Sequence, residues 1–311
     1  MNPAFSVVVF TTLAGAAQGL AVMLALAVLA GLPLAAGFLP AALLVVAAML
    51  VGALGASFLH LGRPERAWRA VAMWRTSWLS REVIVLPAFI GLVALWWLGL
   101  RWGGSGTLLR VVVPLLTIAG ALVLWYCTAM IYACLRFIEE WAQPLTVVTF
   151  ALLGLSSGFL LAAALAAVAG EARLLGLAGP AALGATLVAW LARMLALRRN
   201  DRLRHRSTLQ TATGIRSAHL VQTSMGMTGG SFNTREFFHG ASQAAIRHVR
   251  LAAIVLAFAL PVPLALWGLL GGGALPWLLA VLVQAPGLVA DRWYFFAQAK
   301  HPQNLYYQVV S

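Results

Sequence analysis

Long, continuous runs of apolar residues constrain the fold of this chain more than any other feature. The runs cover about 5–31, 38–60, 82–100, 109–135, 145–169, 175–197, 247–270 and 274–297. With 62% hydrophobic and 9% charged residues, the chain has more apolar surface than a soluble domain can bury. In lipid the backbone has to satisfy its own hydrogen bonds, and continuous rather than alternating runs favour helices over a barrel. We therefore predict an all-α polytopic membrane protein, with residues 1–311 forming one bundle of eight transmembrane helices.

The basic residues predict how the bundle is oriented. Eight spans place both termini on one side, together with 18 of the 21 Lys and Arg residues. The other side receives only Arg101, Arg110 and Arg173. By the positive-inside rule the terminal side is cytoplasmic, in a bacterial inner membrane. The net charge of +13 then reflects topology and partner docking, and we expect no nucleic-acid partner. The first apolar run is long enough to span a bilayer, and the N-terminus does not resemble a cleaved signal peptide.

Few ionisable groups are expected at depth in the bilayer. Transporters place charged or carbonyl ligands near the midplane of the bilayer. The scarcity of ionisable groups at that depth argues against transport, which stays open as an alternative. Cys127 and Cys134 lie seven residues apart in one span and are interpreted as core residues. Two thiols without further ligands indicate no metal site.

The connection between the second and third spans is the strongest candidate for chemistry. His60 closes one span and Glu82 opens the next, so both are expected at the same depth. Quinone reduction consumes two electrons and two protons, and needs a hydrogen-bond donor that exchanges protons, for which His is suited. A carboxylate such as Glu82 can pass protons to water. We predict His60 and Glu82 as the catalytic pair of a quinone site.

Residues of the connection itself complete the predicted quinone site. Gly62 gives a tight turn. Arg63, Arg66 or Arg81 could hold the carboxylate ionised and polarise the second quinone carbonyl. Trp74 and Trp78 could flank the ring, and the stretch also contains Arg69, Arg75 and Trp68. The alternative is purely structural, because a helix cap, a helix dipole and an interfacial tryptophan belt explain the same residue types.

One long polar segment, about 198–246, separates the sixth and seventh spans. Its basic start fits a positive-inside anchor, but its later part mixes glycine, arginine and aromatic residues, which are wasteful in a free loop. We predict a docking surface for a soluble partner, formed by Arg216, Phe232, Asn233, Arg235, Glu236, Phe237 and His239.

The histidines and cysteines predict that this chain carries neither haem nor an iron–sulfur cluster. Haem held by two histidines needs a pair at depth, and His60 stands alone in the spans. If the chain handles quinone, electrons have to pass to or from a metal cluster in a partner subunit.

Two stretches resemble the dimethyl sulfoxide reductase anchor-subunit family (DmsC-like). They are F-L-H-L-G-R-P-E-R-A-W-R-A with S-W-L-S-R-E, and the run from Gly230 to Gly240. The resemblance implies an eight-span anchor that binds ubiquinone or menaquinone at His60 and Glu82. It also implies two partners, an iron–sulfur ferredoxin-like subunit and a molybdopterin catalytic subunit.

The opening residues are similar to those of the sulfite-oxidising relatives (SoeC-like), whose soluble subunits lie in the cytoplasm. This likeness implies sulfite oxidation with quinone reduction, without substrate catalysis by this chain itself. The alternatives are a quinol-oxidising anchor of the dimethyl sulfoxide or polysulfide reductase type, a purely structural anchor, and a transporter.

Overall fold

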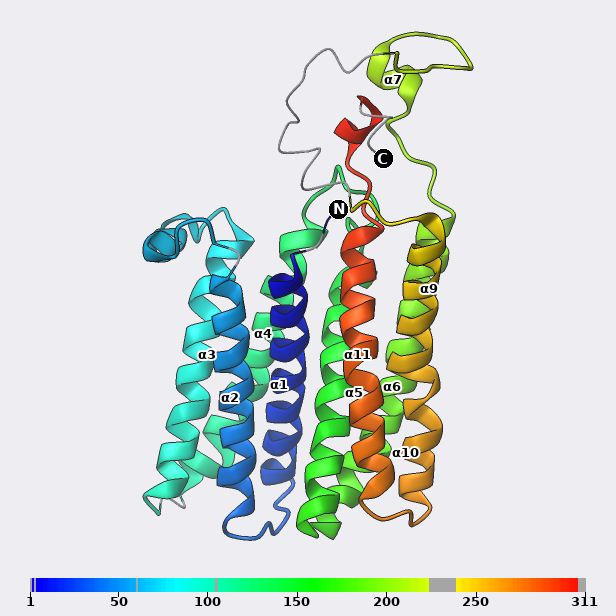
Figure 1. The fold of residues 1–311 in the computed structure, drawn as a ribbon. Helices are drawn as coiled ribbons and strands as arrows, with labels where there is room; N and C mark the ends of the chain where they lie inside the picture. The colour runs from blue at the N-terminus through cyan, green and yellow to red at the C-terminus, as the bar shows by residue number, and fades with distance from the viewer. Residues whose placement is uncertain (1, 3, 60, 104–105, 224–238, 307–311) are drawn as a thin grey trace.

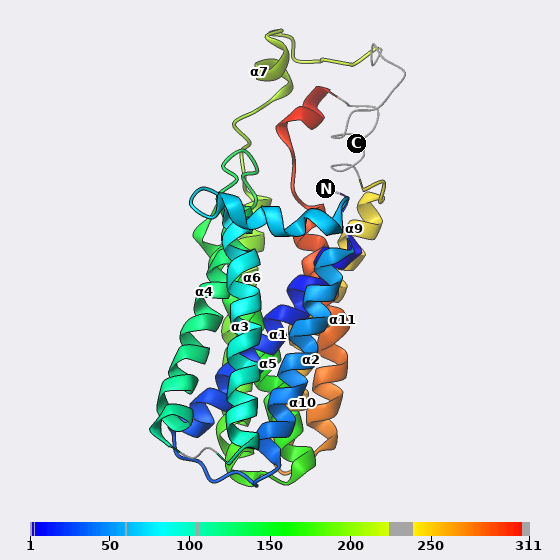
Figure 2. The ribbon, with the colours of Figure 1, turned by 90° about the vertical axis from the view of Figure 1, so that its left-hand side faces the viewer.

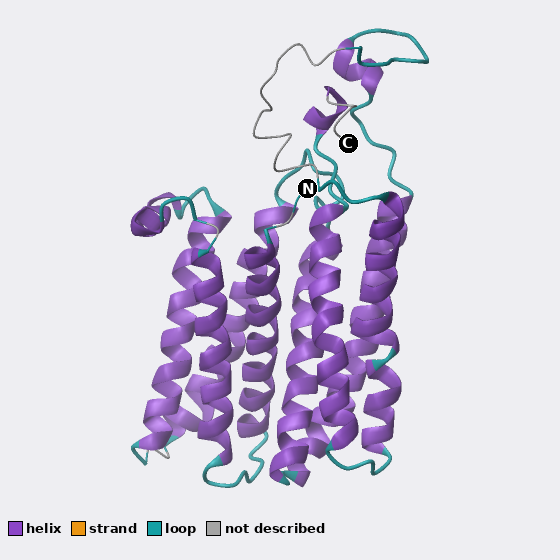
Figure 3. Ribbon diagram, in the orientation of Figure 1, coloured by secondary structure: helices purple, strands orange, loops and turns teal. Residues whose placement is uncertain are grey.

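The structure is a computed structural model that describes residues 2, 4–59, 61–103, 106–223 and 239–306. Every regular element in these ranges is a helix (Figure 3). The long helices are α1 (Phe5–Leu29), α2 (Phe38–Phe58), α3 (Trp78–Arg101), α4 (Val113–Ala133), α5 (Pro144–Ala169), α6 (Ala172–Asp201), α9 (Gln243–Ile254), α10 (Pro261–Leu269) and α11 (Leu275–Ala297). Short helices are η1 (Pro64–Met73), η2 (Leu108–Val112), α7 (Leu209–Thr213), η3 (Val255–Ala259) and η4 (Pro302–Tyr306). The predicted all-helical membrane fold is confirmed.

Seven helices in the described ranges are long and apolar enough to cross a membrane. Two of them are composite, since π-helical η2 leads into α4, and π-helical η3 joins α9 to α10. The eighth predicted span corresponds to α11, which lies along the other helices in Figure 1 but contains Asp291 and Arg292. The count of eight spans therefore stays a prediction, although all eight predicted segments are helical.

The helices run side by side, and the chain starts and finishes at the same end of the bundle. The first turn of α1 and the last turn of α11 lie at that end, and α7 lies beyond it, outside the bundle (Figure 1). The opposite end carries short turns, one of which is fixed by the Glu171 carboxylate, whose Oε1 accepts a hydrogen bond of 2.8 Å from the Ala35 backbone N–H. Which end faces the cytoplasm is a prediction from the basic residues alone.

The central contact of the bundle joins α1 to α5 through glycines. Gly15 and Gly19 on α1, and Gly154 and Gly158 on α5, repeat the small-residue spacing of four that lets membrane helices approach closely. A Cβ atom on Gly158 would lie 2.2 Å from the Gly19 carbonyl carbon. The two backbones thus touch at a point where only glycine fits.

Buried polar pairs join other helices of the bundle. Ser156 of α5 and Thr186 of α6 share a hydrogen bond of 2.8 Å, and the Gln284 amide of α11 donates to Ser156 at 3.0 Å. Arg193 of α6 and Asp291 of α11 form an ion pair at 2.5 Å, with both side chains buried. Neutral polar side chains and one buried ion pair therefore join α5, α6 and α11.

The cysteine prediction is correct for one residue and wrong for the other. Cys127 is buried, whereas Cys134 is exposed because α4 ends there and the thiol points along its last turn to the Ile131 carbonyl oxygen. Both thiols are free.

Candidate functional site

The connection between α2 and α3 folds as a short helix lying across the end of the bundle. After α2 ends at Phe58, η1 begins at Pro64 and runs crosswise over the helix ends (Figure 2). Pro64 suits a first helical position because its missing N–H has no partner there anyway. The Ser77 hydroxyl then caps α3 by accepting from the Ser80 N–H at 3.3 Å. α3 therefore starts four residues before the predicted boundary, and Glu82 lies just past its first turn.

The Glu82 carboxyl group is buried between α3 and α4. Its side chain faces inward with 5% of the residue exposed, and Oε1 accepts a hydrogen bond from the Thr128 hydroxyl of α4. Thr128 is the one side chain in the described ranges that hydrogen-bonds this carboxyl group. His60, its predicted partner, lies outside the described residues.

Arg81, one of the three arginines that we considered as a partner of the Glu82 carboxylate, does not contact it, and its place in the quinone site stays a prediction. Its Nε donates to the Trp74 carbonyl oxygen and its Nη2 to the Arg75 carbonyl oxygen, each at 2.9 Å. The guanidinium carbon also lies 4.0 Å from the centre of the Trp78 ring. The reason is directional, because neighbouring residues on a helix point to different faces. Arg81 faces back to the connection and fixes its end.

The aromatic side chains of the predicted site separate into one packed ring and one exposed ring. Trp78 meets Tyr126 of α4 edge to face, with ring centroids 5.2 Å apart. Trp74 is 51% exposed and has Arg75 beside its ring. Of the two tryptophans, only Trp78 therefore packs against α4, the helix that also supplies Thr128.

The other described residues of the predicted site on this connection are exposed. Gly62, Arg63 and Arg66 lie at the surface, and Arg66 Nε is 4.0 Å from the Glu65 carboxylate. Within the described ranges no arginine lies in ion-pair distance of Glu82. The structure thus pairs Glu82 with Thr128 and Trp78 with Tyr126 between α3 and α4, and leaves these arginines on the outside.

Most of the predicted docking surface falls outside the described residues, namely Phe232, Asn233, Arg235, Glu236 and Phe237. Arg216 is exposed on the segment after α7. His239 is half-buried, its Nδ1 accepts from the Ala241 N–H at 3.0 Å, and its ring centroid lies 6.1 Å from that of Trp293. Burial lowers the pKa of His239 below its usual value. His239 therefore packs on α11 as a neutral side chain at neutral pH.

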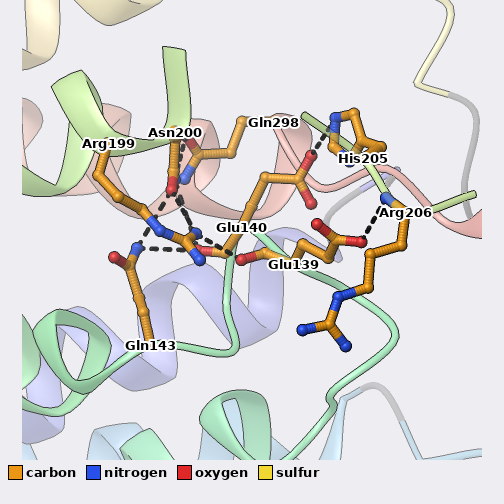
Figure 4. A network of polar contacts seen from close by, with 8 residues as sticks. All are labelled: Glu139, Glu140, Gln143, Arg199, Asn200, His205, Arg206 and Gln298. Carbon is orange, nitrogen blue, oxygen red and sulfur yellow. Dashed lines mark hydrogen bonds and ion pairs between the residues drawn. The ribbon is translucent and has the colours of Figure 1, made fainter. Parts of the chain in front are cut away.

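A second polar cluster, which the sequence analysis did not identify, lies at the same end of the bundle (Figure 4). It joins the α4–α5 connection to the ends of α6 and α11. Asn200 is its centre, since its amide donates to the Glu140 carbonyl oxygen and to the Gln298 side chain. The cluster consists of Glu139, Glu140, Gln143, Arg199, Asn200, His205, Arg206 and Gln298. No group of three or more His, Cys, Asp or Glu in the described ranges is arranged to hold a metal ion.

Two comparisons relate the whole arrangement to known proteins. The sequence model of the "DMSO reductase anchor subunit (DmsC)" family matches residues 1–257. The chain is also 51% identical to a subunit of the sulfite dehydrogenase of Allochromatium vinosum, over an alignment that covers 100% of both chains.

Proposed function

The chain belongs to the family of DMSO reductase anchor subunits (DmsC), and on that premise we propose that it is the quinone-reactive membrane subunit of a sulfite:quinone oxidoreductase. As a family member it is a multi-pass membrane protein and a subunit of an oxidoreductase complex, which implies soluble catalytic and electron-transfer partners. The proposal adds the quinone, the sulfite and the identity of those partners.

The proposed partners are a molybdopterin subunit and a ferredoxin-like iron–sulfur subunit. Sulfite and water give sulfate, two protons and two electrons in the molybdopterin subunit, and the electrons pass through the iron–sulfur clusters to the membrane. The quinone accepts two electrons and takes up two protons. The basic end of the chain supports placing both partners on the cytoplasmic side.

The observation that carries the proposal is the buried carboxyl group of Glu82 beside Thr128. A carboxyl group in a mostly apolar pocket can bind and release a proton next to a redox substrate. Glu82 and Thr128 supply polar groups of the kind that a ring with two carbonyl oxygens needs, and the same two helices, α3 and α4, carry the aromatic pair Trp78 and Tyr126. In this proposal His60 donates a hydrogen bond to one carbonyl oxygen, Glu82 relays protons to water, and Thr128 orients the carboxyl group.

Substitution of the two proposed catalytic residues tests the quinone site. His60→Ala and Glu82→Gln are expected to lower sulfite-dependent quinone reduction by about a hundredfold or more, which is the usual contribution of acid–base catalysis. Reduction of a soluble dye by the partner subunits should stay unchanged, since it bypasses the membrane subunit. Glu65→Gln is the matched control, because Glu65 is an exposed acid of the same connection. If both variants reduced quinone at the wild-type rate, the quinone site would be refuted, and the chain would be a purely structural anchor for the soluble subunits.

Purification of the intact complex tests the substrate. A molybdopterin subunit that reduces quinone with sulfite supports the proposal. A complex that instead oxidises quinol with dimethyl sulfoxide or polysulfide would show that the chain is a quinol-oxidising anchor of the reductase type.

A further inference from the structure

A cavity of about 900 Å³ opens at the basic end of the bundle, away from Glu82. It lies where the end of α6, the start of α9 and the end of α11 meet the α4–α5 connection. Its volume is in the range of ligand-binding pockets, and its walls are mixed polar and apolar. The polar side chains that matter for its occupant are Glu140, Asp201, His205, His239, Gln298 and Lys300.

Two polar atoms on this wall are buried and have no hydrogen-bond partner among the described residues. They are Glu140 Oε2, a hydrogen-bond acceptor, and Gln298 Nε2, a donor. Glu140 as a whole is only 4% exposed. A buried polar atom without a partner is costly, so native structures rarely keep one unless a ligand, water or another chain completes it.

Glu140 also has no permanent positive partner in the part of the chain that the structure describes. Within the described ranges its one ionic neighbour is His205, with Nε2 3.6 Å from Oε1, and an imidazole is charged only when it is protonated. Burial lowers the pKa of His239, which keeps the other imidazole of the cavity neutral. Asp201, by contrast, is paired with Arg250 through two bonds of 2.8 and 2.6 Å. Glu140 is therefore the acid of the cavity that lacks a fixed counter-charge.

The framework around Glu140 is rigid, so the carboxylate is held where it is. Asn200 binds the Glu140 carbonyl oxygen, and Arg199 donates to the Glu139 carbonyl oxygen (Figure 4). Trp141, the next residue, donates from its indole nitrogen to the Phe295 carbonyl oxygen at 2.9 Å. Fixed groups of this kind are suited to recognition, because little freedom is lost when a partner binds.

We propose that this cavity is a docking socket for a basic residue of a soluble partner subunit. A Lys or Arg side chain of the partner enters from the basic end and donates to Glu140 Oε2, while a carbonyl oxygen of the same segment accepts from Gln298 Nε2. A peptide segment supplies both groups, whereas a lone metal cation supplies only one. The inference rests on the proposed function to the extent that a soluble partner exists, but it does not depend on quinone or sulfite.

The retention of soluble subunits on membranes tests the socket, measured over a series of NaCl concentrations with the full complex. Glu140→Gln removes the charge and keeps the shape, and we expect the Kd for the soluble subunits to rise about 30-fold or more, as for a buried charge pair that loses one member. Glu140→Arg should release the subunits at every salt concentration. Glu139→Gln is the matched control, because within the described ranges its Oε1 accepts only a backbone N–H, that of Arg206 at 2.9 Å, and an amide oxygen can do the same.

A second variant guards against misfolding. Ala241→Trp narrows the socket from the α9 side and leaves Glu140 intact, so it should also release the partner, while the thermal unfolding midpoint of the solubilised chain stays at the wild-type value. Wild-type salt profiles for Glu140→Gln and Ala241→Trp would overturn the socket and leave water as its occupant. Retention by the wild type tests the proposed partner itself, and the difference between the Glu140 and Glu139 variants tests the socket.

Discussion

The Thr128 hydroxyl decides how the Glu82 carboxyl group is presented. Thr128→Val keeps the volume and removes the donor, and we expect about a tenfold loss of quinone-linked turnover, the usual worth of one hydrogen bond to a charged group. Thr128→Ser keeps the hydroxyl and should retain most activity. Turnover with a soluble dye should be the same in both. Equal quinone turnover in the valine and serine variants would show that the contact only packs α3 against α4.

Glu82 was accessible to sequence analysis, and Thr128 was not. An acid at the edge of a long apolar run is conspicuous, because charge in or near a bilayer needs a reason. Thr128 lies in an apolar run on another helix, 46 residues away along the chain, where threonine usually bonds its own backbone. Glu140 was missed for a related reason, since its burial follows from how the connection folds over α11.

The direction in which the Arg81 side chain points also could not be predicted from the sequence. An arginine next to a glutamate suggests an ion pair, but consecutive helical residues diverge by about 100° and a long side chain can turn back to a carbonyl oxygen. Arg81 does so at Trp74 and Arg75. The sequence therefore predicted which residues lie at the connection between α2 and α3, whereas the contacts among their side chains depend on side-chain geometry.

Among the helices, the contact between α1 and α5 is the most sensitive to volume. Gly158→Ala would place a methyl group 2.2 Å from the α1 backbone, at the Leu20 nitrogen, which cannot move aside as a side chain does. We expect a loss of about 1–3 kcal/mol or more of stability, measured as a lower thermal unfolding midpoint of the detergent-solubilised chain.

Gly184→Ala is the matched control for this substitution. Gly184 lies on α6, and nothing lies within 4 Å of the place that an added methyl group would take, so alanine there should leave the midpoint unchanged or raise it. Equal midpoints for the Gly158 and Gly184 variants would contradict a close approach of α1 and α5.

Helix positions followed from the sequence because bilayer-length apolar runs leave the backbone one solution. All eight expected segments are helical, with ends shifted by only a few residues. The π-helical turns η2 and η3 were not expected, since apolar side chains carry no signal for a change of backbone pitch. Which helices touch was equally hidden, and the close packing of α1 on α5 became clear only from the structure.

In the molecule as a whole, polar chemistry gathers at one end. Glu82 lies just inside that end of α3, and the socket around Glu140 lies at the same end, at the tips of α6 and α11. The opposite end has short turns and few charged groups. An anchor whose electrons come from soluble subunits needs its redox site and its docking sites on one side, because transfer between distant faces of a bilayer would be slow. The two proposed sites meet this requirement.

The side that this end faces can be tested with single cysteines. Replacing Cys127 and Cys134 gives a thiol-free background. Ile215→Cys then reports the basic end, and Gly106→Cys reports the opposite end, since both positions are exposed. With 18 of the 21 basic residues on the Ile215 side, the positive-inside rule predicts that this side is cytoplasmic.

A membrane-impermeant maleimide added to intact spheroplasts should label the Gly106 variant at once and the Ile215 variant only after permeabilisation. Labelling of Ile215→Cys in intact spheroplasts would place the Glu140 socket and the Glu82 site on the outer face. The soluble subunits would then have to be exported, and a cytoplasmic sulfite oxidation would be excluded.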